Sequence, residues 1–94
     1  MFDVTRTDAG HIVFHGRLDA SQTNKARNAL DAVAESCIID FSSLDYISSA
    51  GLGVLLATQK RLSESGHALA IAGMNRHIRD VFHIAGFDLV FTIE

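Results

Sequence analysis

The chain has 94 residues, which suffices for one domain over residues 1–94 and leaves little room for a second. Because 48% of the residues are hydrophobic and 20% are charged, the composition excludes a disordered chain. The net charge of -3 provides no basic surface, so nucleic acid is not an expected partner. No apolar run approaches the roughly 20 residues that span a bilayer, and no signal peptide is recognisable. We therefore expect no membrane insertion, and the single cysteine favours the reducing cytoplasm.

The chain begins with the pattern of a β-hairpin. Apolar side chains alternate over residues 2–6 and again over residues 11–16, and a turn sequence lies between them. A helix follows, because apolar residues recur at helical spacing from residue 26 to residue 33. Either Asp19 or Ser21 is suited to cap it.

The rest of the chain alternates strands and helices. Residues 37–41 are a short apolar run, typical of a strand buried on both faces. The further predicted elements are a helix over residues 49–63, a strand over 68–73, a helix over 76–85 that Asn75 caps, and a strand over 89–93. Such alternation favours right-handed crossovers and a parallel sheet. We predict an α/β fold with a mixed, mostly parallel sheet of four or five strands, an N-terminal antiparallel hairpin, and three or four helices.

The segment YISSAGLG, residues 46–53, is the candidate functional site, because ligand chemistry in α/β sheets lies at the carboxyl ends of strands. One interpretation is structural: Ser48 or Ser49 caps the helix, and the glycines relieve crowding between helix and sheet. A phosphate-binding loop is disfavoured. No lysine follows the glycines, and Gly51 and Gly53 lack the third glycine of a dinucleotide fingerprint.

Catalysis and metal binding are disfavoured as well. A hydrolase elbow has glycine two residues either side of its serine, whereas Ile47 and Gly51 flank Ser49. The five histidines show no metal-ligand spacing, so we expect no metal, no cofactor, no catalytic residue and no enzyme. The remaining interpretation is a phosphorylated serine. Its charge of about -1.5 to -2 is stabilised by roughly 0.3–1 kcal/mol at a helix N-terminus.

The sequence IIDFSSLDYISSAGLGVLLATQKRL, with GRLDA before it and IAGMNRHIRDVFHIAGFDLVF after it, resembles the STAS family. It looks most like the bacterial anti-sigma factor antagonists, and the resemblance covers nearly the whole chain. The resemblance implies partner switching in signalling and transcription regulation. Such antagonists bind a serine kinase that is also an anti-sigma factor, are phosphorylated by it and released, and are reset by a PP2C-like phosphatase.

Carried over by position, the resemblance puts the phosphate acceptor at Ser49. It implies that Asp19 and Asp40 line the site and face the kinase, with Asp40 closing the central strand. It also implies that residues 42–47 form a short loop. The kinase-facing set is completed by residues around the acceptor, namely Ile47, Ser48, Gly51 and Leu52. The two apolar side chains of this set are expected to dock against the partner.

One position departs from the family pattern. Many members have Asp immediately before the acceptor, where this chain has Ser48, so Ser48 is a second candidate acceptor. The alternative function within the family is a non-phosphorylated STAS subunit of a membrane lipid-transport ATPase. Such subunits often lack the acceptor serine, so the presence of Ser49 favours the phosphorylated switch.

Overall fold

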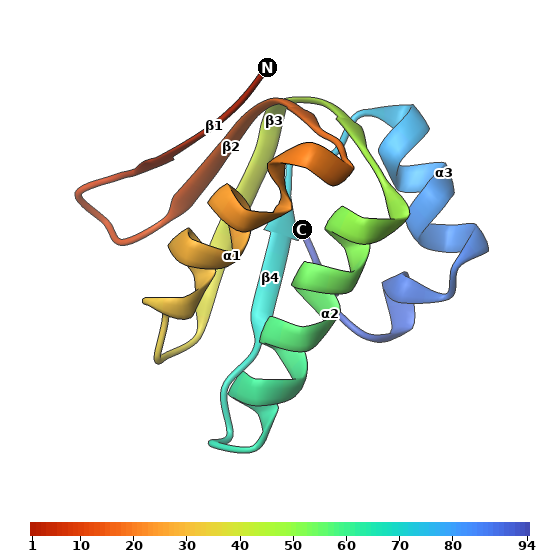
Figure 1. Cartoon of the computed structure of the whole chain (residues 1–94). Helices are drawn as coiled ribbons and strands as arrows, with labels where there is room; N and C mark the ends of the chain where they lie inside the picture. Colours follow the sequence, from red (N-terminus) through yellow and green to blue (C-terminus); the bar gives the residue numbers. More distant parts are fainter.

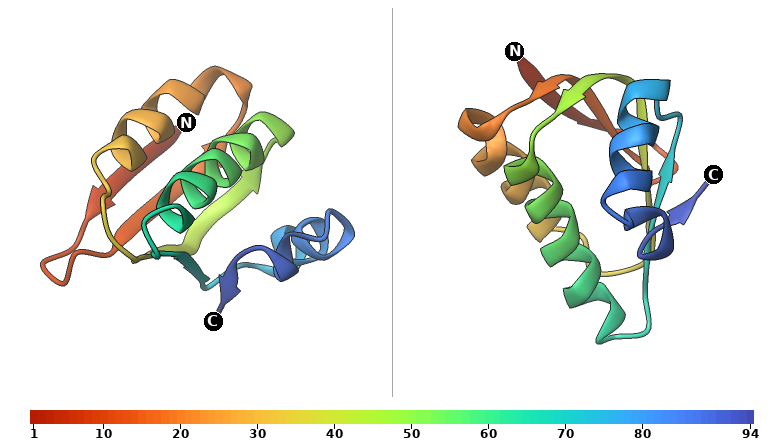
Figure 2. Two further views of the ribbon diagram at one scale, coloured as in Figure 1. Left: turned by 90° about the horizontal axis from the view of Figure 1, so that it is seen from below. Right: turned by 90° about the vertical axis from the view of Figure 1, so that its right-hand side faces the viewer.

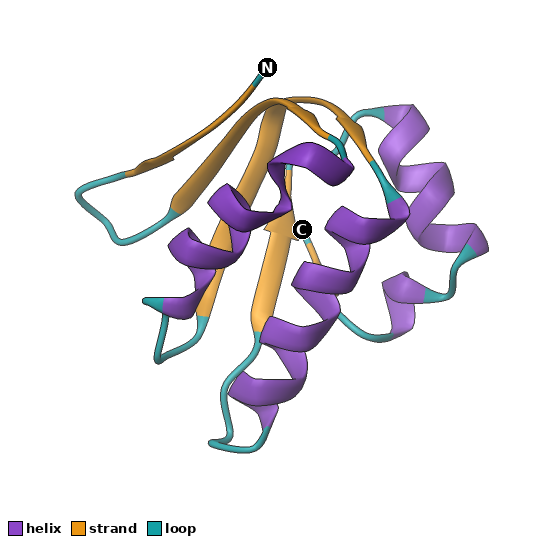
Figure 3. Cartoon of the chain, viewed as in Figure 1, coloured by secondary structure: helices purple, strands orange, loops and turns teal.

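The computed structural model describes residues 1–94 as one mixed β-sheet with helices packed on it (Figure 1). The strands are β1 (Phe2–Arg6), β2 (Ile12–Leu18), β3 (Cys37–Ile47), β4 (Leu69–Ala72) and β5 (Thr92–Ile93). The α-helices are α1 (Thr23–Asp31), α2 (Ser49–Ser63) and α3 (Arg76–Ile84), and the short 3-10 helices are η1 (Ala20–Gln22) and η2 (Phe87–Leu89) (Figure 3). The predicted α/β fold and the predicted order of its strands and helices are confirmed.

All three α-helices pack on the same face of the sheet. The strand order is β1-β2-β3-β4-β5, with β1 antiparallel to β2 and the other neighbours parallel. Because the order in space follows the order in the chain, each right-handed crossover steps in the same direction and puts its helix on the same side. The right-hand view of Figure 2 shows α1 and α2 on one side of the strands. The opposite face of the sheet carries no helix.

This one-sided arrangement divides the side chains of the central strand. In β3, Ile39 and Phe41 are fully buried under the helices, whereas Ile38 and Asp40 are half-buried on the helix-free face. The prediction that residues 37–41 are buried on both faces is therefore wrong. A strand is buried on both faces only where helices cover both sides of the sheet.

Strand β3 is longer than predicted and includes residues 42–47, so the expected loop there is wrong. The buried residues of this part, Phe41, Leu44 and Ile47, are three residues apart instead of two. The register of β3 against β2 shifts twice, each time by one extra residue on β3. Each bulge turns the strand enough to bring the next apolar residue back to the core face. Apolar residues in this part of β3 therefore do not alternate with polar ones, and the sequence pattern does not reveal the strand.

The last strand is shorter than predicted, because residues 87–91 pack against α3 instead of joining the sheet. Gly86, with φ 75°, ends α3 and turns the chain into η2. The rings of Phe82, Phe87 and Phe91 then contact one another, with centroids 5.7 to 5.9 Å apart. This aromatic cluster leaves only Thr92–Ile93 to pair with β4.

Candidate functional site

The segment YISSAGLG lies where the parallel strands β2 and β3 end together. Leu18 is the register partner of Ile47, and the backbone N–H of Ser48 donates to the Leu18 carbonyl over 2.9 Å. Asp19 follows β2 directly and therefore lies beside the start of α2. In Figure 1 the chain passes from the end of β3 over the edge of the sheet into α2. This is the edge where ligand and partner sites of α/β folds occur.

Ser48 is the N-cap of α2. Its Oγ accepts a hydrogen bond from the Gly51 N–H over 3.1 Å, and its carbonyl accepts one from the Leu52 N–H over 2.9 Å. Its backbone is extended, with φ -85° and ψ 167°, as in a standard N-cap. The side chain is half-buried. The hydroxyl of Ser48 is therefore occupied in holding the first turn of α2.

Ser49 is the first residue of α2, and its side chain is exposed to solvent. The capping hydrogen bond of this turn goes to Ser48 and leaves the Ser49 hydroxyl free. The first turn of α2 contains no acidic residue, so no carboxylate of the helix itself offsets its positive dipole end. A helix N-terminus of this kind stabilises an anion placed at its first residue.

Asp19 is the acidic group nearest to this turn along β2. Its carboxylate accepts hydrogen bonds from the Ser21 hydroxyl over 2.6 Å and from the Ser21 N–H over 3.0 Å. The bond from the Ser21 side chain is the main reason that the pKa of Asp19 lies below its ordinary value, and the charge of Arg17 contributes in the same direction. Asp19 is therefore a negative charge beside the start of α2, and it caps η1, not α1.

Asp40 lies away from this turn, because β3 continues for seven residues beyond it. The expectation that Asp40 closes the strand is wrong, and its place facing a kinase stays a prediction. Its carboxylate accepts from the Ser42 N–H over 2.8 Å, which is the main reason that the pKa of Asp40 is lowered. The charges of His11 and His15 on the helix-free face lower this pKa further.

The two apolar residues expected to dock against a partner are buried. Ile47 is 6% exposed and Leu52 is 8% exposed, and both belong to the hydrophobic core. Their side chains pack in the core beneath the turn, where a partner cannot contact them. The exposed surface of this turn comes instead from small residues, Ser49 and Ala50.

The two glycines of α2 differ in their surroundings. A Cβ on Gly51 would lie 2.9 Å from Leu18 Cγ and 3.0 Å from Ile47 Cγ1, so glycine allows α2 to approach the sheet closely. A Cβ on Gly53 would have no atom within 4 Å. Glycine inside a helix is about 0.5–1 kcal/mol less stable than alanine. The interpretation that glycines relieve crowding is confirmed for Gly51 and wrong for Gly53.

Two residues near this edge escaped the sequence-based prediction. The guanidinium of Arg17 lies 4.4 Å from the centroid of the Tyr46 ring, and the two residues are register partners across β2 and β3. Their pairing depends on the second bulge of β3, which no pattern in the sequence reveals. They place a positive charge against an aromatic ring one residue before the last register pair of β2 and β3.

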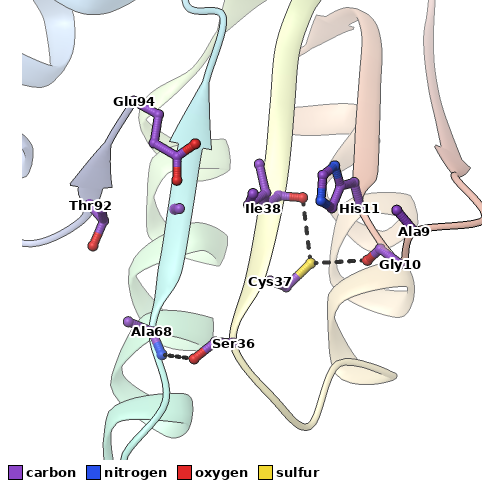
Figure 4. Close-up of a pocket in the computed structure, with 10 residues that line it drawn as sticks. Ala9, Gly10, His11, Ser36, Cys37, Ile38, Ala68, Thr92 and Glu94 are labelled. Carbon is purple, nitrogen blue, oxygen red and sulfur yellow. Dashed lines mark hydrogen bonds between the residues drawn. The ribbon is translucent and has the colours of Figure 1, made fainter.

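The largest cavity lies at the other end of β3 (Figure 4). It has a volume of about 400 Å³, and its lining includes His11, Cys37 and Glu94. Burial raises the pKa of the Cys37 thiol, which favours its protonated form. Cys37 begins β3 and Ser49 follows its end, so the whole strand separates this cavity from the candidate site.

Nowhere do three or more His, Cys, Asp or Glu side chains gather closely enough to hold a metal ion. None of the helices combines the length and the apolar character needed to cross a membrane.

The family model described as "Mlab, STAS domain" matches residues 2–92, so the chain belongs to the STAS domain family. The putative anti-sigma factor antagonist BtrV of Bordetella bronchiseptica is 41% identical over 56 residues, which cover 60% of this chain and 48% of BtrV. The aligned part thus spans about half the length of that relative. The anti-sigma-B factor antagonist of Listeria monocytogenes is 29% identical over 92 residues, covering 94% of this chain and 81% of that protein. Both relatives are named as anti-sigma factor antagonists.

Solved structures share the fold. An anti-sigma factor antagonist from Mycobacterium paratuberculosis has a TM-score of 0.82 at 22% identity, over 99% of this chain and 83% of that chain. The antagonist SpoIIAA has a TM-score of 0.72 in its unphosphorylated form, at 19% identity over 100% of this chain and 87% of that chain. The Bacillus SpoIIAA in its phosphorylated form has a TM-score of 0.71, at 20% identity over 100% of this chain and 91% of that chain. At these identities the likeness concerns the fold alone.

Proposed function

We propose that this protein is an anti-sigma factor antagonist that acts by partner switching in the cytoplasm, with residues 1–94 working as one domain. When Ser49 is unmodified, the protein binds a serine kinase that is also an anti-sigma factor. The kinase phosphorylates Ser49 and releases the antagonist, and a PP2C-like phosphatase restores the hydroxyl. The observation that carries this proposal is the exposed Ser49 hydroxyl, at the first position of a helix that a different residue caps.

The capping geometry favours Ser49 over Ser48 as the acceptor. The Ser48 hydroxyl already accepts from Gly51 N–H, and losing an N-cap costs about 0.5–2 kcal/mol. Ser48 is also half-buried, whereas Ser49 is open to an approaching kinase. A phosphate on Ser49 therefore leaves the hydrogen bonds of the first turn intact.

The electrostatics of the turn account for release. A phosphate adds about -1.5 to -2 charges to a neutral surface that stands beside the ionised Asp19. Like charges placed together in an interface cost several kcal/mol, and each 1.4 kcal/mol changes affinity tenfold. The same charge is stabilised within the free domain by the N-terminus of α2. Phosphorylation therefore weakens binding without unfolding the protein.

The relatives support this proposal in two ways. Those aligned with this chain include proteins named as antagonists. SpoIIAA occurs in both unphosphorylated and phosphorylated forms, and the two forms resemble this chain to nearly the same degree. In that protein the phosphate thus leaves the fold in place, as expected of a switch that changes surface charge.

Phosphopeptide mapping of the protein isolated from its own cells under several growth conditions tests the proposal. We expect phosphate on Ser49, with an occupancy that changes with condition. A kinase captured by Ser49→Ala, then purified, should bind this variant constitutively and bind Ser49→Asp at least tenfold more weakly. Ser48→Ala tests the alternative acceptor: it should still be phosphorylated on Ser49, although it loses the N-cap of α2. Ser63→Ala, at the exposed far end of α2, is the matched control, and it should bind and be phosphorylated like the wild type. Equal affinity of the Ser49→Ala and Ser49→Asp variants for the kinase would refute the switch.

A second candidate function is a non-phosphorylated STAS subunit of a membrane lipid-transport ATPase. The observation in its favour is the description of the matching family model, which carries the name Mlab and not that of an antagonist. Absence of phosphate on Ser49 under every condition, together with stoichiometric co-purification of an ATPase, would establish this function and exclude the switch.

A further inference from the structure

Gly53 occupies a helical position where nothing in the chain requires glycine. A Cβ there would have no atom within 4 Å, and Gly53 is not among the glycines with positive φ. It lies in the second turn of α2, on the exposed side of the helix. Since glycine weakens a helix, the free domain would be more stable with alanine at this position. Neither crowding nor backbone conformation within the chain therefore accounts for glycine at this position.

Gly53 shares its face of α2 with Ser49. Residues four apart lie above one another on a helix, separated along its axis by about 6 Å at 1.5 Å per residue. A specific protein interface covers roughly 800 Å² on each partner, which is far more than one helical turn. A kinase that encloses the Ser49 hydroxyl in its active site therefore covers Gly53 as well.

The side chains around Gly53 define the kind of contact. Its helical neighbours three and four positions away are Ser49, Ala50, Leu56 and Ala57, all exposed and uncharged, and Leu56 is 40% exposed. The glycine thus forms a notch in an apolar strip, bordered by one leucine and two methyl groups. Such a notch fits an uncharged, apolar part of a partner that packs directly on the helix backbone.

We propose that the kinase partner of the Ser49 switch packs against the backbone of α2 at Gly53, so that Gly53 is a specificity-determining contact residue. This inference rests on the proposed function, and it adds a contact site to it. Any side chain at position 53 then keeps the partner away from α2, while leaving the acceptor hydroxyl and its helix start intact.

The test uses the purified serine kinase captured by Ser49→Ala, with the affinities of the variants measured by calorimetry and Ser49 phosphorylation by phosphopeptide analysis. We expect Gly53→Ala to bind about tenfold more weakly and Gly53→Leu about a hundredfold or more. The larger side chain should weaken binding more, because it overpacks the contact with the partner more severely. The control is Ser63→Leu, which places the same side chain at an exposed position at the far end of α2 and should bind within about twofold of wild type.

Folding of the variants is followed by thermal unfolding. Gly53→Ala should have a midpoint at or above that of the wild type, which separates lost binding from lost structure. Wild-type affinity of Gly53→Leu, or equal losses in Gly53→Leu and Ser63→Leu, overturns the contact at Gly53. If Ser49→Asp still loses binding in that case, the proposed function stands. If Ser49→Ala captures no serine kinase, both the proposed function and this inference fail.

Discussion

Replacing each glycine of α2 with alanine is expected to change stability in opposite directions. In Gly53→Ala the new methyl group meets no atom within 4 Å. The substitution improves helix propensity and restricts the unfolded chain, so it should stabilise the protein by about 0.5–1 kcal/mol. In Gly51→Ala the methyl group would lie 2.9 Å from Leu18 Cγ and 3.0 Å from Ile47 Cγ1, well inside ordinary contact distance.

The size of the Gly51 effect follows from how firmly its neighbours are held. Leu18 is fully buried and Ile47 is 6% exposed, so neither side chain has free space to move into. Forcing an extra methyl group into such a core costs about 1–3 kcal/mol. The gain in helix propensity, about 0.5–1 kcal/mol, offsets part of this cost. We expect a net loss of about 1–2 kcal/mol, so the two variants should differ by roughly 2 kcal/mol.

Urea denaturation followed by circular dichroism measures both free energies of unfolding, because a domain of this size is expected to unfold in a two-state transition. The difference corresponds to a separation of roughly 8–16 °C in the midpoints of thermal unfolding. A gain of stability in both variants would show that α2 does not press on the sheet at Gly51. A loss in both would show that the outer side of Gly53 is not open to solvent.

Other substitutions test the helix caps and the hydrogen-bonded pair of His83 and Asp88. Ser48→Ala should lower the free energy of unfolding by about 0.5–2 kcal/mol, whereas Ser48→Asp, which keeps a capping oxygen, should stay near wild type in the same urea titration. Asn75→Ala loses the 2.8 Å cap of α3 and a 3.2 Å hydrogen bond to the Leu44 carbonyl, so we expect a loss of about 1–2 kcal/mol, and Asn75→Asp should recover the capping part. The hydrogen bond to Asp88 raises the pKa of His83, so its contribution to stability is complete below the ordinary pKa and is lost as pH rises through the raised value. An NMR titration should find the pKa of His83 above its ordinary 6.5, and Asp88→Asn should bring it back toward that value.

Much of the fold could be predicted because it rests on local chemistry. Alternation by two identified the hairpin, and helical spacing identified α1, α2 and α3 within a few residues. Asn75 was recognised as the cap of α3 from its side chain alone, and the structure confirms it. The prediction for β3 ended too early, at residue 41, because the bulges space its buried residues by three. Only the pairing with β2 makes this spacing compatible with burial.

The candidate site divides in the same way. The sequence alone determined that a serine pair begins a helix at the carboxyl end of a strand, because caps and periodicity are local properties of a few residues. Only the tertiary structure decided which serine is capped and which is free, because the choice depends on where the Gly51 N–H points. It alone placed Asp19 beside this turn and Asp40 away from it, since register and bulges arise from pairing between distant segments. It alone separated Gly51 from Gly53, because crowding depends on side chains of Leu18 and Ile47 that reach the helix only in the folded chain.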